Sequence, residues 1–407
     1  MTRARANGEG SIFPYRNGYA AYAWVTKPNG LRARKYVYGK TRDDVHEKWI
    51  KLLQRARQGP VPTRVPTVAA YVTNWLEDVV RPNLAPTTYV KYETFSRLYI
   101  VPGIGAKRLD RLQVRDVQTW LNRVRTTCQC CAQGKDARRP DDERRCCALD
   151  PMRCCADVPS PATVRSARET LRSALASAMT DELVSRNVAA MARLPTGRAR
   201  KPQAWTSEQV RSFLESARRS DDPLYAAYVL ILVLGLRKGE VLGLAWSDVN
   251  LDTAELTISH QLQRVGRQLL RRDTKTQASD AVLPLPDICV TALKRRQGEQ
   301  PADREAAGEV WEEWGFVFTS RHGTPIDPRN FNREFTTRCR RAGVPVITVH
   351  DARRTCATLL VDLDVHPRVV MQVLRHAKFS ITMEIYSKVT SAQTRDALKR
   401  LGDSLDE

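Results

Sequence analysis

Towards the C-terminal end of the chain, two histidines, an arginine and a tyrosine follow one another at His350, Arg353, His376 and Tyr386. His350 and Arg353 stand three residues apart, so they share one face if the segment is helical, as the apolar run over residues 355–363 predicts. A guanidinium can hold phosphate oxygens, an imidazole can exchange protons, and a phenol oxygen can attack phosphorus. Together these side chains could cleave a phosphodiester without a metal ion.

A further candidate lies far upstream, at Arg237. The apolar run over residues 225–236 predicts a helix that ends at this arginine, with Gly235 and Gly239 on either side of the turn and Glu240 three residues later. An arginine at such a place can present its planar fork to a phosphate while its neighbours stay packed. We therefore expect Arg237 to hold a phosphate, and Glu240 to orient Arg237 or His350.

These segments, taken in chain order, resemble a known family. The sequence Gly-Leu-Arg-Lys-Gly-Glu at 235–240, His-Asp-Ala-Arg-Arg-Thr at 350–355, and then His376 and Tyr386, is similar to the motifs of the tyrosine recombinases, specifically the phage-type integrases. The resemblance implies a site-specific DNA recombinase that cuts and rejoins strands through a 3′-phosphotyrosine intermediate, without ATP or a catalytic metal. Such an enzyme integrates and excises a phage or another mobile element.

The resemblance also implies partners. It predicts double-stranded DNA with core and arm-type attachment sites as the substrate, and a homotetramer on paired DNA sites. It leaves open whether a directionality factor and a host DNA-bending protein take part.

The resemblance assigns roles to the candidate residues. Arg237, Arg353 and His376 would donate hydrogen bonds to the oxygens of one phosphate, and Tyr386 would attack its phosphorus. Lys275, in a Thr-Lys-Thr turn between two predicted strands, matches the family lysine that protonates the leaving 5′ oxygen.

His350 is expected to accept the proton of the attacking tyrosine, and no cofactor is expected for catalysis. No acidic cluster of the kind that binds two magnesium ions stands beside these residues in the sequence, which argues against a metal nuclease. Two alternatives remain. A catalytically silent DNA-binding regulator could keep the same scaffold, although the intact set of residues argues against it. A type IB topoisomerase-like enzyme would share the chemistry but relax any supercoiled DNA by itself.

The composition supports a polyanionic partner. The 407 residues include 66 Lys and Arg against 45 Asp and Glu, giving a formal net charge of +21. A basic chain could also lie on anionic lipid. The sequence contains no apolar run of about 18 residues and no signal-peptide pattern at its start, so we expect a cytoplasmic protein bound to nucleic acid.

The pattern of the chain predicts a multidomain α+β protein that begins with a small sheet. Within residues 1–59, aromatic β-prone runs at 11–15, 19–25 and 34–38 are separated by Asn-Gly turns and followed by a helix over 45–58. This segment resembles the arm-type DNA-binding domain of phage-type integrases, and it could read a major groove. The alternative is a solvated basic sheet that only adds nonspecific affinity. Residues 60–66, rich in proline, are expected to be a linker.

Two larger domains are expected after the linker. The apolar pattern of residues 67–197 predicts an all-α domain, similar to the core-binding domain of the family. Residues 198–407 predict a mainly α catalytic domain with a small antiparallel sheet built from strands at 254–260 and 281–286. Residues 261–272 either pair with the first of these strands or form a loop.

A cysteine-rich insertion over residues 128–155 departs from the family pattern. It holds seven of the ten cysteines of the chain. Disulfides are not expected in a cytoplasmic protein, whereas a Cys-x-x-Cys pair with two Cys-Cys doublets could supply four thiolates to a tetrahedral structural zinc ion. The alternative is a disordered or merely packed loop. Seven thiols exceed four ligands, so the ligand set stays open among Cys128, Cys131, Cys146, Cys147, Cys154 and Cys155.

Overall fold

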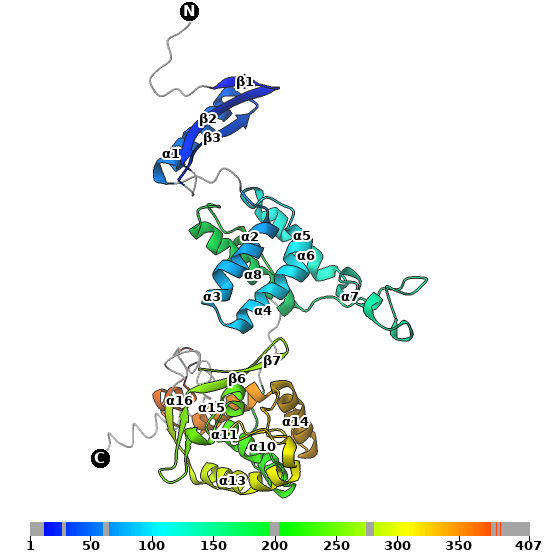
Figure 1. Cartoon of the computed structure of the whole chain (residues 1–407), viewed down its shortest axis with the longest axis vertical. Helices are drawn as coiled ribbons and strands as arrows, with labels where there is room; N and C mark the ends of the chain where they lie inside the picture. The colour runs from blue at the N-terminus through cyan, green and yellow to red at the C-terminus, as the bar shows by residue number, and fades with distance from the viewer. Residues whose placement is uncertain are drawn as a thin grey trace, which may run out of the picture. The chain divides into compact units, whose positions relative to one another are not determined.

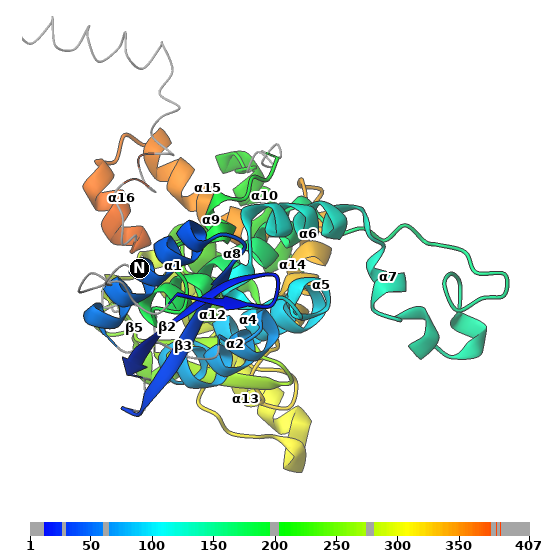
Figure 2. The ribbon, with the colours of Figure 1, turned by 90° about the horizontal axis from the view of Figure 1, so that it is seen from above.

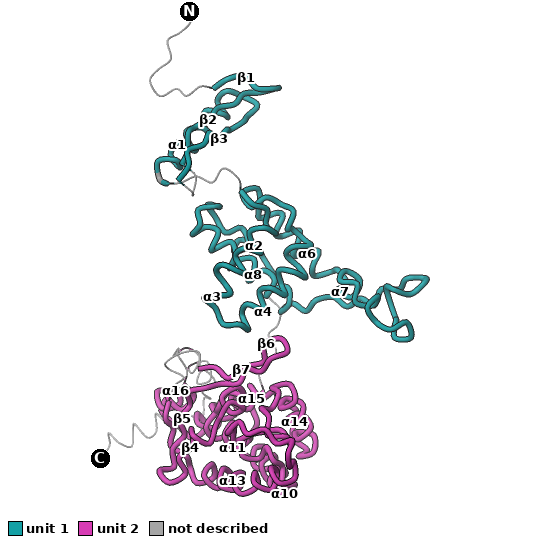
Figure 3. The backbone as a smooth tube through the Cα atoms, in the orientation of Figure 1, with its two compact units in different colours: residues 1–197 teal, residues 198–407 magenta. Residues whose placement is uncertain are grey.

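The structure, a computed structural model, describes residues 12–26, 30–59, 65–195, 203–273 and 281–375, together with Ser380 and Met383. The chain forms two compact units, residues 1–197 and residues 198–407 (Figure 3). Helices and strands are labelled in Figure 1. No helix of the described residues is both long enough and apolar enough to cross a lipid bilayer.

The first unit begins with a three-stranded antiparallel sheet in the order β1-β2-β3, formed by β1 (Phe13–Tyr15), β2 (Gly18–Thr26) and β3 (Arg32–Gly39). Helix α1 (Arg42–Gln58) packs on one face of it, because Ala21, Ala23 and Val25 alternate along β2 towards the helix. Thr41 caps the helix, since its side chain accepts a hydrogen bond from the backbone N–H of Asp44. The predicted strands and helix of this segment are therefore present.

The rest of the first unit is helical. A core of buried aromatic and aliphatic side chains lies between its helices and includes Trp75, Trp120 and Leu171. The α-helices are α2 (Val68–Trp75), α3 (Arg81–Asn83), α4 (Pro86–Phe95), α5 (Val101–Ile104), α6 (Val114–Thr126), α7 (Gln129–Ala132), α8 (Pro161–Thr180) and α9 (Val188–Met191). Short 3-10 turns lie at Leu109–Arg111, Asp136–Arg138 and Asp141–Glu143, and π-helical turns at Leu76–Val80 and Ser96–Ile100 join α2 to α3 and α4 to α5.

The glycine-containing stretch after residue 100 begins as helix α5. Gly103 is required there because a Cβ atom would lie 2.3 Å from the indole ring of Trp120. Its glycine therefore reflects close packing of α5 on α6 rather than a need for a turn.

The second unit packs its helices around a core of aromatic side chains, in which Phe213, Tyr228, Phe331 and Phe335 contact one another. The helices are α10 (Ser207–Arg219), α11 (Tyr225–Val233), α12 (Lys238–Leu242), α13 (Asp287–Ala307), α14 (Pro328–Arg341), α15 (Val349–Asp362) and α16 (Pro367–Leu374), with 3-10 turns at Trp246–Asp248 and Gly308–Val310.

Strands β4 (Val249–Asn250), β5 (Glu255–Ile258) and β8 (Ala281–Pro284) form one small sheet of this unit, in the order β4-β5-β8. Strands β6 (His260–Val265) and β7 (Gln268–Asp273) form a separate hairpin. Residues 261–272 thus pair with each other around Gly266, whose φ is +59°, rather than with the preceding strand. The predicted antiparallel sheet of residues 254–260 and 281–286 is present as β5 and β8, whereas residues 261–272 form a second sheet of their own.

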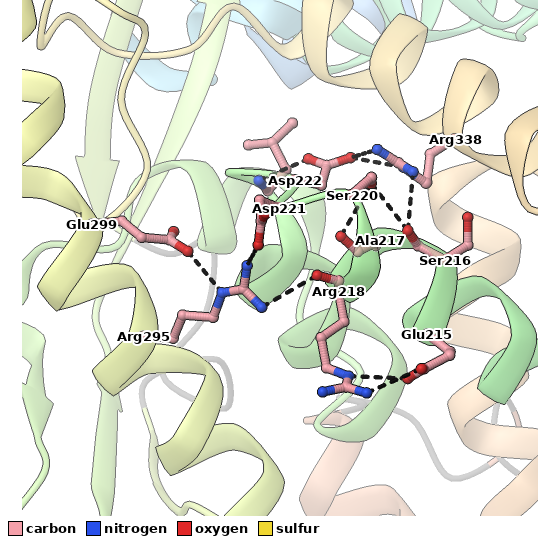
Figure 4. Close-up of polar contacts among 11 residues, drawn as sticks. Glu215, Ser216, Ala217, Arg218, Ser220, Asp221, Asp222, Arg295, Glu299 and Arg338 are labelled. Carbon is pink, nitrogen blue, oxygen red and sulfur yellow. Dashed lines mark hydrogen bonds and ion pairs between the residues drawn. The ribbon is translucent and has the colours of Figure 1, made fainter.

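Ion pairs fix the turn after α10 to two other helices of the unit (Figure 4). Asp221 pairs with Arg295 of α13 at 2.5 Å, and Asp222 pairs with Arg338 of α14 at 2.6 Å. Arg338 also donates to the backbone carbonyl oxygen of Ser216 at 3.3 Å. Since α14 supplies a wall of the cavity described below, these contacts hold that wall in place.

Candidate active site

Arg237 lies between α11 and α12, and one carboxylate binds both its backbone and its side chain. Glu240 accepts from the Arg237 backbone N–H at 2.8 Å through Oε2 and from Arg237 Nη1 at 2.5 Å through Oε1. Helix α11 stops at Val233, earlier than the apolar run predicts, because Gly235 adopts a left-handed φ of +59°. The turn therefore places the guanidinium at the start of a new helix, with part of its surface exposed.

Glu240 is buried and holds a second arginine as well. Its Oε2 atom lies 2.6 Å from Nη2 of Arg375. Burial alone would raise the pKa of Glu240, but the charges of Arg375 and Arg237 outweigh burial and lower it. Glu240 is therefore ionised and lies between Arg237 and Arg375. The structure places it with Arg237, one of the two residues that the sequence predicts it to orient.

Arg353 lies in the first turns of α15 and is only 5% exposed. Its two terminal nitrogens donate to the backbone carbonyl oxygens of Gly235 and Leu374. Burial and the neighbouring charge of Arg237 lower the pKa of Arg353 to about 9. The side chain therefore carries a poorly compensated positive charge, which an anion in the site would stabilise.

His350 precedes Arg353 by one helical turn, on the same face of α15, as the spacing predicts. Burial, reinforced by the charge of Arg353, lowers the pKa of His350 below its usual value of 6.5. The ring is therefore neutral at pH 7 and has a nitrogen that can accept a proton.

Arg237, His350 and Arg353 line a single cavity of about 550 Å³. Lys238 also lines it, and its Nζ atom donates to Asn332 Oδ1 at 3.1 Å. The other lining residues come from the start of α12, from α14 and from the segment that leads into α15: Leu236, Gly239, Asn332, Phe335, Thr336, Val346, Ile347, Thr348 and Val349. The structure thus gathers three of the six predicted catalytic residues. Lys275, His376 and Tyr386 lie outside the described residues.

Arg375 belongs to this site and was not among the predicted site residues. It is 3% exposed, and its backbone is left-handed, with a φ of +53°. Besides its pair with Glu240, its carbonyl oxygen accepts from Arg237 Nη2 at 3.0 Å. A signal was available in the sequence, because Arg375 directly precedes His376 at the end of an apolar helix. Two guanidinium groups therefore pair with one carboxylate, and Arg353 adds a third positive charge nearby, so the surplus of positive charge suits a phosphate anion.

The cysteine-rich segment contains two groups of thiols that could each hold a metal ion. One group is Cys128, Cys131 and Cys154, and the other is Cys130, Cys146 and Cys147; within each, the sulfur atoms lie within 4.8 Å of one another. Cys130, absent from the predicted ligand set, is part of the second group.

Comparisons with known proteins relate the chain to one family. The model of the phage integrase family matches residues 203–393, and that of the phage integrase N-terminal SAM-like domain matches residues 67–124. A tyrosine recombinase XerC-like protein of Caldanaerobacter subterraneus subsp. tengcongensis is 26% identical over 395 residues, which cover 92% of this chain and 93% of the relative. An integrase of Saccharopolyspora erythraea is 26% identical over 453 residues, covering 97% and 96% of the two chains.

A solved structure of the Tn1549 transposon integrase, in complex with a circular intermediate DNA, has a similar fold. It superposes with a TM-score of 0.63 at 19% identity and covers 83% of this chain and 99% of that chain. The two matching family models and the near full-length relatives lead to one assignment. The chain belongs to the phage integrase family, the tyrosine recombinases that carry out site-specific DNA recombination for phages and transposons.

Proposed function

We propose that Arg237 and Arg353 hold the scissile phosphate of an attachment site in the cavity beside His350. The observation that carries this proposal is the meeting of two arginines, from segments more than a hundred residues apart, in one cavity next to a neutral imidazole. Glu240 and the Arg375 carbonyl oxygen each take one N–H of the Arg237 terminal nitrogens, and the remaining N–H groups of the guanidinium can donate to phosphate oxygens. Pre-aimed donors of this kind stabilise the charge that develops on those oxygens during attack.

The reaction then follows from the remaining residues. The Tyr386 oxygen forms a bond to phosphorus while the bond from phosphorus to the 5′ oxygen breaks. His350 accepts the phenol proton, Lys275 supplies a proton to the leaving 5′ oxygen, and His376 adds a hydrogen bond to the phosphate. The product is a 3′-phosphotyrosine linkage, which retains the energy needed to join the strand to a new 5′ hydroxyl without ATP. The roles of these residues rest on the family motif in the sequence.

The N-terminal segment, residues 1–59, is proposed to bind arm-type sites. Its sheet has one face turned away from α1, on which Trp24 pairs across the strands with Arg34, and Tyr22 with Tyr36. The Arg34 guanidinium lies over the Trp24 ring at 4.9 Å and over the Tyr22 ring at 5.0 Å. A guanidinium held over aromatic rings on the open face of a sheet favours contact with a DNA groove over a basic sheet that adds only nonspecific affinity.

The helical segment, residues 67–197, is proposed to contact the core site, and the unit from residue 198 to perform catalysis. The enzyme would act as a homotetramer on paired sites, integrating and excising its mobile element. A directionality factor and a host DNA-bending protein are proposed accessory partners. The cysteine-rich insertion is proposed to hold structural zinc. The protein is proposed to work in the cytoplasm.

A nicked DNA substrate tests the catalytic proposal. The substrate carries the junction sequence of the element, with a nick close to the cut, so that a short fragment diffuses away after cleavage and the covalent protein remains attached to DNA. The wild-type protein should give a covalent adduct on a denaturing gel. Tyr386→Phe should bind the DNA without forming the adduct, whereas Tyr225→Phe, in the same unit, should still form it.

Other results would favour the alternatives. An adduct from Tyr386→Phe would show that another residue is the nucleophile. DNA binding without any adduct from the wild-type protein would favour a silent regulator. Relaxation of a supercoiled plasmid that lacks the attachment site would favour a topoisomerase.

A further inference from the structure

The cysteine-rich segment joins two long helices, and its buried cluster is formed by cysteine side chains. It begins two residues after α6 ends at Thr126 and finishes shortly before α8 begins at Pro161. Figure 2 shows it as a loop that leaves the helices of its unit around α7. Its buried cluster consists of Cys128, Cys130 and Cys146, with Cys131 and Cys147 packed against them.

The large apolar side chains of this segment do not build a core. Leu149 is 36% exposed and Met152 is 71% exposed. Ordering a residue of the chain costs about 1–2 kcal/mol of backbone entropy, which a loop of this kind cannot offset by hydrophobic burial. Metal binding can supply the missing free energy, as it does in small metal-dependent domains.

The distances between sulfur atoms are those of metal ligands. Neighbouring thiolates on one tetrahedral zinc ion, with bonds of about 2.3 Å, lie about 3.8 Å apart. The sulfur atoms of Cys128 and Cys155 are 3.6 Å apart, those of Cys131 and Cys154 are 3.7 Å apart, and those of Cys146 and Cys147 are 4.0 Å apart. Cys130 and Cys146 are closer, at 3.3 Å. These separations far exceed the disulfide bond length of about 2.05 Å.

The seventh thiol, Cys155, lies against both groups. Its sulfur lies 3.6 Å from that of Cys128 in the first group, and it is close enough to Cys130 and Cys146 of the second group to act on their thiols. Cys131 of the first group also neighbours Cys147 of the second, so the two groups lie side by side. Two separate tetrahedral sites need eight thiolates, but two sites that share one ligand need seven, which is the number of cysteines in this segment.

We propose that the segment binds two zinc ions that share Cys155, one held by Cys128, Cys131, Cys154 and Cys155 and the other by Cys130, Cys146, Cys147 and Cys155. This inference deepens the structural zinc of the proposed function and rests on it. Sharing a thiolate removes one negative charge from the cluster compared with two independent sites. The lower charge reduces the repulsion between thiolates, because the thiols of the first group pack directly against those of the second.

A backbone group also acts on one of the thiols. The backbone N–H of Ala156 donates to the Cys154 sulfur at 3.4 Å. Such N–H groups stabilise the deprotonated sulfur, which is the form that binds metal.

Asp136 fixes the Cys146-Cys147 turn from behind. This fully buried carboxylate accepts from the backbone N–H groups of Cys146 at 2.9 Å and Ala148 at 3.0 Å, and pairs with Arg139 at 2.6 Å. Its hydrogen bonds prearrange two ligands of the second ion, as outer-shell partners of metal sites commonly do.

Zinc content and thiol titration of the full chain, purified under reducing conditions without a chelator, test the proposal. Two zinc ions per chain are expected. One ion per chain would overturn the shared cluster but leave a single structural zinc standing. No zinc and ten reactive thiols after denaturation would overturn both. No zinc and four reactive thiols would show three disulfides in place of the metal, since six of the ten cysteines would be oxidised.

X-ray absorption at the zinc edge of the wild-type protein tests the shared ligand without a mutation. A bridging thiolate predicts an all-sulfur shell and a metal–metal distance of about 3.5–4 Å. Two zinc ions without a metal–metal signal would overturn the bridge. Cys155→Ser should lose at least one ion, and Met152→Ser, an exposed neighbour in the same segment, should keep both. Retention of two ions by Cys155→Ser would also overturn the bridge.

Discussion

Glu240 and Arg375 form an ion pair with an Oε2 to Nη2 distance of 2.6 Å, and their side chains are 3% and 1% exposed. The same carboxylate holds the backbone and the side chain of Arg237. Glu240 therefore links the end of α16 to the start of α12, and the position of Arg237 depends on both.

Replacing this carboxylate should destabilise the catalytic unit. Glu240→Gln leaves Arg375 and Arg237 without their shared counter-ion, and breaking a buried pair in this way costs about 3–5 kcal/mol. We expect a lower midpoint for the unfolding of the second unit in urea and a large loss of cleavage. Glu215→Gln, which removes an exposed partner of Arg218, should cost no more than about 1 kcal/mol. Equal losses for the two variants would contradict the linking role of Glu240.

The left-handed backbone of Arg375 gives a second test. Both Arg375→Gly and Arg375→Ala remove the ion pair, but glycine adopts the φ of +53° without strain and alanine does not. The glycine variant should be more stable than the alanine variant by about 1 kcal/mol, as judged from urea unfolding, while both cleave DNA more slowly than the wild type. An alanine variant as stable as the glycine variant would show that the turn relaxes when the side chain is lost.

Lysine at either cavity arginine should retain charge but lose the planar fork. Arg237→Lys and Arg353→Lys are each expected to lower single-turnover cleavage about 10²–10³-fold, with little change in DNA affinity, because the lost contacts matter most in the transition state. Arg353→Lys also gives up the bonds to Gly235 and Leu374, so its stability should fall further. Arg354→Lys, one residue away, is the control and should cleave at nearly the wild-type rate.

The pH profile of cleavage should report His350. Because folding lowers its pKa below 6.5, the ring stays neutral, and able to accept a proton, at pH values where a free histidine is already half protonated. The single-turnover rate should hold steady as the pH falls through 6.5 and decline only below it. Between pH 6.5 and the folded pKa of His350, this histidine is protonated in the unfolded chain but not in the folded one. The folded state should therefore lose stability as the pH decreases through that window. His350→Gln should remove the inflection; an inflection at or above 6.5 would contradict this role.

Much of this site could be predicted from residue types and spacing. His350 and Arg353 share a helix face because i and i+3 always do, and Arg237 lies at a helix boundary because Gly235 before it ends α11. The capped helices were equally predictable, as at Thr41, where a side-chain oxygen before an acidic first turn fixes the start of α1.

Other features depend on tertiary contacts that no local pattern carries. Arg375 becomes part of the site only because Glu240, 135 residues away, meets it in the core. The β6–β7 hairpin pairs with itself because the chain reverses at Gly266, and its pattern of side chains alone allowed either partner. Cys130 could not be assigned as a ligand from spacing, since three cysteines within four positions can divide between two sites only in three dimensions.

The closeness of Cys128 and Cys155 has a practical consequence for engineering the protein. The two sulfur atoms lie 3.6 Å apart, and the backbone N–H of Gln129 donates to the Asp157 carbonyl oxygen at 2.7 Å, so both ends of the segment meet at a narrow neck. The ends of α6 and α8 are thus held together by these contacts, independently of the residues between Gln129 and Cys155. The exposed tip at Asp141–Glu143 is accordingly the place to graft an epitope or a fluorescent label without disturbing the helices on either side.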